Sequence, residues 1–174
     1  MQDTTGLLAP YGWGLGYPDW VDVPQPSAGA NASVLVDGTN IVRVLAARAR
    51  LTTSATVANR FVSLDYVDAR SNVRASSGAS VAVPASQTNV QHEWDYNRAA
   101  GSSGAGAQTS SPLLFTFLPP GFTIRFTVLN IDGTDQLSSL SLWVARFNTG
   151  PRGEPTGMVT ALEEARGALG LPDR

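Results

Sequence analysis

The residues able to do acid–base or nucleophilic chemistry are few, and the sequence gives no sign that they converge. His92 is the only histidine, and its neighbour Glu93 falls on the opposite face of a strand, so the two are not expected to act together. Serines occur in polar runs, without a Gly-x-Ser-x-Gly elbow or a second histidine for a triad. The chain has no cysteine, which excludes thiolate nucleophiles and cysteine-ligated metals. The sequence therefore predicts no catalytic residue and no cofactor.

One acidic cluster, residues 130–135, carries oxygen ligands of the kind that calcium prefers. It includes Asp132 and Asp135 but lacks the full acidic spacing and the terminal glutamate of an EF-hand loop. The favoured interpretation is a hairpin turn that uses Asp132 and Gly133 for their backbone geometry, so no metal site is predicted. A hydrolase whose carboxylates converge from distant strands stays a remote alternative, because no residue pattern points to it.

The elements that must position these side chains are strands. In residues 60–67, one strand face carries Val62, Leu64 and Tyr66, and the other carries Phe61, Ser63 and Asp65. The first face has the larger apolar set, so it should face a core. About eight strands are expected from nine candidate segments, at residues 32–36, 41–46, 47–52, 60–67, 80–84, 90–96, 113–118, 122–128 and 137–147. Residues 101–111 have the Gly/Ser composition of a flexible loop. The prediction is an all-β domain over residues 33–148, a jelly-roll-like antiparallel β-sandwich, with an immunoglobulin-like sandwich left open.

Both ends of the chain differ from this domain. Residues 1–32 are rich in Gly, Pro and aromatics, which favours an extended N-terminal arm. The arm either folds back on its own domain or, as we favour, lies on a neighbouring subunit. Its predicted partner-binding anchors are Tyr11, Trp13, Tyr17 and Trp20. Residues 149–174 are expected to form a linker and a short amphipathic helix, residues 156–168, which must dock on its own sandwich or an adjacent subunit.

Charge and hydropathy restrict the partners. Charged residues make up 15% of the chain, the net charge is −2, and the arginines are scattered singly, so nucleic acid is not an expected partner. No apolar stretch is long enough for a bilayer-spanning helix, and the N-terminus has no signal-peptide pattern, so a soluble protein made in the cytoplasm, with no membrane partner, is expected. A polar but weakly charged surface suits packing against other subunits.

Residues 41–148 resemble small β-sandwich virion structural proteins of tailed bacteriophages and prophages. The resemblance is carried by turns and strand edges at residues 51–60, 118–125, 130–136 and 143–147. It implies a non-enzymatic virion protein of the capsid decoration, cement or minor structural type, with no catalytic residues to carry over. The implied partners are the major capsid protein or other virion proteins, and the implied state is a homo-oligomer, for example a trimer.

Two further functions stay open at this stage. A tail or fibre binding module would stack host-surface glycans on exposed aromatics, with Trp13, Trp20 and Trp94 as candidates. A hydrolase on the same scaffold is the remote third. The fold alone does not decide among them, because one sandwich architecture hosts many functions.

Overall fold

The structure, a computed structural model, describes residues 17–38, 40–78, 81–96, 101–102, 108–113 and 116–148. Within these residues lie ten strands and no helix. The strands are β1 (Tyr17–Asp22), β2 (Ala32–Leu35), β3 (Asn40–Thr52), β4 (Phe61–Val67), β5 (Val73–Gly78), β6 (Val90–Asp95), β7 (Gly101–Ser102), β8 (Gln108–Pro112), β9 (Thr123–Leu129) and β10 (Gln136–Asn148). The prediction of an all-β domain is confirmed.

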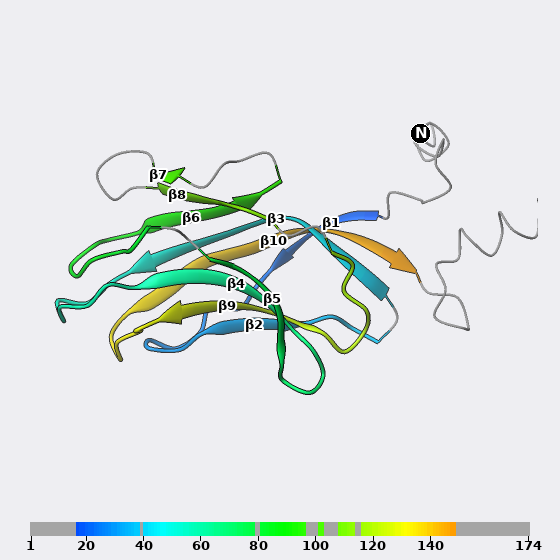
Figure 1. Ribbon diagram of the computed structural model, residues 1–174, viewed down its shortest axis with the longest axis horizontal. Coiled ribbons are helices and arrows are strands. Elements are labelled where there is room, and N and C mark those ends of the chain that lie inside the picture. Colours follow the sequence, from blue (N-terminus) through cyan, green and yellow to red (C-terminus); the bar gives the residue numbers. More distant parts are fainter. Residues whose placement is uncertain are drawn as a thin grey trace, which may run out of the picture.

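The strands form two sheets that lie one above the other (Figure 1). One has the order β1-β10-β3-β6-β8-β7, and the other has the order β2-β9-β4-β5. Neighbouring strands are antiparallel except β6 and β8, which run parallel. The arrangement is sandwich-like, with β1, β2, β5 and β7 at the four sheet edges.

The space between the sheets is filled by one apolar cluster. Val62, Leu64 and Tyr66 of β4 are buried in it, as their alternation predicts. Trp94 of β6 reaches across and meets Phe126 of β9 edge to face, with ring centroids 5.8 Å apart. Because the cluster draws side chains from both sheets, burial holds the two layers together.

Several boundaries differ from the sequence prediction. Residues 41–46 and 47–52 are one continuous strand, β3. Of the predicted strand 80–84, the described residues 81–84 contribute only an isolated bridge at Val83. The predicted loop 101–111 is wrong at its ends, where β7 and β8 form. β8 needs no apolar alternation because its partner β6 supplies the hydrogen-bonding template. Strands β1 and β5 were not expected either.

The turn at Asp132 and Gly133 forms as predicted, but it is not a hairpin. It joins β9 of the four-stranded sheet to β10 of the six-stranded sheet, so it is a corner between layers. The predicted helix, residues 156–168, lies outside the described residues, as do Tyr11 and Trp13.

Candidate interaction surface

Strand β1 holds the described part of the predicted arm on its own sheet. Residues Tyr17–Asp22 pair with β10 along their whole length, at the edge of the six-stranded sheet. Val23 follows and is buried in the core, with its N–H donated to the carbonyl of Leu140. Residues 17–23 are therefore part of the folded body, and Trp20 belongs to the sheet.

Trp20 stacks on a second tryptophan that the sequence analysis did not single out. The register of β1 and β10 places Trp20 directly opposite Trp143, and the two rings lie nearly parallel, 5.9 Å apart and 14° inclined. Their exposed fractions are 57% and 40%, which is high for the largest apolar side chain. The sequence analysis identified Trp143 only as a strand residue. Its role depends on its partner Trp20, which lies 123 residues earlier in the chain, so no local sequence pattern reveals it.

A polar row lies beside this stacked pair on the outer face of the sheet. This polar row crosses four strands and lies two residues along β1 and β10 from the tryptophan pair. In it, Asp22 pairs with Ser141, Ser141 pairs with Arg48, and Arg48 pairs with Glu93. Arg48 Nε lies 3.4 Å from Glu93 Oε1, and the amide of Gln91 donates to the same oxygen at 2.7 Å. The face thus carries aromatic rings next to planar polar side chains.

Both ends of the described domain lie at the same end of this sheet. Tyr17, where β1 begins, is paired with Arg146, and Asn148, where β10 ends, is paired with Asn40. The side chain of Arg146 lies between two carboxylates here, 3.0 Å from Asp19 and 3.4 Å from Asp37. These ion pairs join β1, β10 and the β2–β3 turn at the point where the chain enters and leaves the sandwich.

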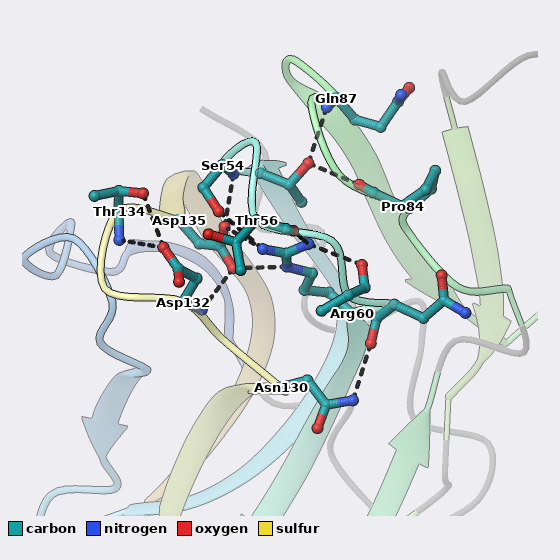
Figure 2. Close-up of polar contacts among 12 residues, drawn as sticks. Ser54, Thr56, Arg60, Pro84, Gln87, Asn130, Asp132, Thr134 and Asp135 are labelled. Atoms are coloured by element: carbon teal, nitrogen blue, oxygen red, sulfur yellow. Dashed lines mark hydrogen bonds and ion pairs between the residues drawn. The ribbon is translucent and has the colours of Figure 1, made fainter.

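The opposite end is closed by a buried ion pair (Figure 2). The guanidinium of Arg60 donates to Asp135 from Nε at 2.9 Å and from Nη2 at 3.2 Å, and neither side chain is exposed. Its remaining donors reach the Ser54 hydroxyl and the carbonyls of Thr56 and Ala58, so all five are used. This contact ties the β3–β4 loop to the β9–β10 corner.

The acidic residues of the 130–135 cluster serve this corner. Burial opposes the charge of Asp135, but the backbone N–H groups of Asp132 and Ser54 and the Arg60 guanidinium together lower its pKa. Hydrogen bonds from the N–H and hydroxyl of Thr134 lower the pKa of Asp132. Within the residues that the structure describes, no group of three His, Asp or Glu side chains gathers to hold a metal.

His92 and Trp94 lie inside the sandwich. Burial lowers the pKa of His92 to about 4, so this imidazole is neutral at pH 7. Trp94 is 1% exposed and donates its indole N–H to the Ser77 carbonyl at 2.9 Å, which joins the sheets at their β5–β6 side. Trp94 is therefore inaccessible to a glycan, and its place among the glycan-stacking candidates was wrong.

A network of polar side chains lies on the outer face of the four-stranded sheet. Asp65 accepts hydrogen bonds from Ser76 and Thr127, each at 2.6 Å, and Arg125 lies 3.6 Å from the same carboxylate. Beside them is an open groove of about 450 Å³ whose lining includes Leu35 and Gly121. No aromatic side chain is among the residues that line this groove, in contrast to the Trp20–Trp143 pair on the other sheet.

The described part of the chain contains no helix able to cross a lipid bilayer. The chain matches no protein-family profile, no curated protein and no solved structure.

Proposed function

We propose that this chain is a non-enzymatic structural protein of a phage virion, a capsid decoration or cement protein that grips the shell with segments leaving one end of its sandwich. The observation that carries this proposal is the adjacency of Tyr17 and Arg146, because it brings the end of residues 1–16 close to the start of residues 149–174. Two segments that leave from one place can engage one underlying surface.

The strand order supports a jelly roll as the finer description of the fold. If β7 and β8 are set aside as an insertion, the first strand pairs with the last, β2 with β9, β3 with β6, and β4 with β5. This is the nested pairing of a long antiparallel ribbon rolled up on itself, in which successive strands alternate between the sheets except at the β4–β5 hairpin. Eight strands in two sheets of that kind make a jelly roll, an architecture that viral capsid domains use.

The ion pairs at the exit end support a rigid mounting for the arm. Arg146 on β10 contacts Asp19 on β1 and Asp37 in the β2–β3 turn, so these ion pairs join the strand that follows the arm to two neighbouring segments. Tyr11 and Trp13 then lie only a few residues upstream of Tyr17, within reach of a neighbouring protein. Aromatic side chains of this kind make strong interface anchors.

Attachment through short segments suits a repeating shell. Each contact is weak by itself, but several arms of a homo-oligomer, such as a trimer, bind with high effective concentration once the first has bound. The expected partners are the major capsid protein and neighbouring copies of this chain, and the expected location is the virion. A body with few charges presents little to desolvate when it packs on them.

The test is co-sedimentation with capsids that lack this protein. The full chain is compared with a form lacking residues 1–15, a deletion that spares β1, since a cut to residue 30 would remove β1 and Val23 from the fold. Saturable binding by the full chain and its loss in the truncated form are expected. The double variant Tyr11→Ala/Trp13→Ala should behave like the truncation.

Phe61→Ala serves as the matched control, because this exposed aromatic lies on the other sheet and should leave shell binding unchanged. Absence of saturable shell binding by the full chain would refute the decoration role. Full binding by the truncated form would show that residues 1–15 are not needed for attachment to the shell.

A further inference from the structure

We infer that the outer face of the six-stranded sheet is a binding platform for a neutral glycan, centred on the Trp20–Trp143 stack. This inference goes beyond the proposed attachment role and does not depend on it, since it uses a different surface. The argument rests on the shape of the stack, the side chains beside it and the charge of the face.

The indole pair has the features of a sugar-stacking surface. Trp20 lies on β1 and Trp143 on β10, and these two strands pair with each other. Strand β10 also pairs with β3 on its other side, so the sheet fixes the backbone at both tryptophans. The rings support each other at 5.9 Å and 14°, which restricts their rotamers before any ligand arrives. The apolar C–H face of a pyranose ring can lie flat on an indole of this exposure.

Hydrogen-bonding groups stand at the right distance from that stack. Asp22, Ser141 and Arg48 lie side by side on three neighbouring strands. Asp22 and Ser141 are two residues from Trp20 and Trp143 along their strands, which puts this row about 7 Å from the row of the tryptophans. Asp22 is exposed, and the side chain of Arg48 is 57% exposed although it contacts Glu93. Carboxylate and guanidinium groups form planar, paired hydrogen bonds, and adjacent sugar hydroxyls offer matching geometry. A short oligosaccharide can therefore contact both rows.

The charge of the face favours a neutral ligand. In the row of the two tryptophans, strand register adds Asp95. With Asp22 and Glu93 of the polar row, three carboxylates stand against the guanidinium groups of Arg48 and Arg50, so this part of the face has no excess of positive charge. An anionic partner such as nucleic acid requires an excess of cations, which this face does not have.

The experiment is isothermal titration calorimetry of the full chain with chitohexaose, cellohexaose, maltohexaose and a soluble mannan. Binding of at least one of these neutral glycans is expected, together with a change in tryptophan fluorescence. Trp20→Ala and Trp143→Ala should each weaken that binding about tenfold or more, and Asp22→Ala should weaken it by less. Phe61→Ala, which removes an exposed aromatic from the opposite sheet, should leave it unchanged.

Three outcomes would overturn the inference. These are no binding of any of the four glycans, binding that survives both tryptophan substitutions, and a Trp143→Ala protein that sediments as a smaller oligomer than the wild type. The last would assign the stack to a contact between copies. Thermal unfolding of each variant checks that it is folded, and shell co-sedimentation of Trp143→Ala separates this inference from the decoration role.

Discussion

The buried Arg60–Asp135 pair allows a stability prediction whose size follows from its contacts. Asp135 accepts four hydrogen bonds: from Ser54 N–H and Arg60 Nη2 on Oδ1, and from Arg60 Nε and Asp132 N–H on Oδ2. Asp135→Asn keeps the shape of the side chain but replaces one oxygen by an NH₂ group. That group then faces two donors, and the Arg60 charge is left buried without a counter-ion.

The expected loss in the free energy of unfolding is about 3–5 kcal/mol, the range measured when one member of a buried ion pair is removed. A second estimate agrees with this loss. A hydrogen bond to a charged group contributes roughly 1.5–3 kcal/mol, so the loss of two such bonds has a similar effect on the free energy of unfolding. Domains of this kind are stable by only about 5–15 kcal/mol, so the variant should stand near the edge of unfolding at 37 °C.

Urea unfolding followed by tryptophan fluorescence measures this loss. Asp132→Asn is the matched control: this neighbouring carboxylate accepts from Thr134 at the surface and should cost only a small part of the loss at Asp135. The double variant Arg60→Met/Asp135→Leu should be more stable than either single variant, because it leaves no buried charge alone. A loss below about 1 kcal/mol in Asp135→Asn would refute the reasoning.

Three further predictions follow from burial and backbone geometry. Burial lowers the pKa of His92 from 6.5 to about 4, so between these pH values the unfolded chain binds a proton that the folded chain does not. The free energy of unfolding should therefore fall by about 3 kcal/mol as the pH drops from 6.5 to 4. In urea melts at a series of pH values, His92→Gln should remove this pH dependence. The pKa of Asp135 is lowered, so its contribution should persist through that window and disappear only at pH values below the ordinary carboxylate range, as an acid titration of Asp135→Asn beside the wild type can verify. Gly29→Ala should cost roughly 2–4 kcal/mol in a thermal melt, because Gly29 has φ +72° and an added Cβ would lie 2.7 Å from the Gly133 Cα, whereas Gly133→Ala meets no atom within 4 Å and should be nearly silent.

Local sequence pattern anticipated the parts of the fold that depend on neighbouring residues. The alternation of Val62, Leu64 and Tyr66 correctly marked a buried face, because strand side chains alternate whatever the strand pairs with. Ile124, Phe126 and Val128 alternate in the same way along β9 and are likewise buried. It did not find β8, whose Gly/Ser-rich surroundings look like a loop and whose strand conformation comes from β6.

The candidate sites depend on contacts that are distant in sequence. Asp132 and Gly133 were identified as a turn, but nothing local distinguishes a hairpin from a corner between sheets. That choice decides whether Asp135 reaches Arg60, which lies 75 residues earlier. Likewise, Trp94 and Trp143 look alike in sequence, yet one is buried and the other exposed, since the sheet that forms around each strand decides which of its faces is inside.

The sequence by itself determined that the described domain is all-β, that the chain carries few groups able to do chemistry, and which strand faces are apolar. These properties follow from composition and from the two-residue period of a strand. Only the tertiary structure decided that Trp20 lies opposite Trp143, that Arg60 lies against Asp135, and that residues 17 and 148 lie at one end. The physical reason is that strand register is set by hydrogen bonds and burial between segments far apart in the chain.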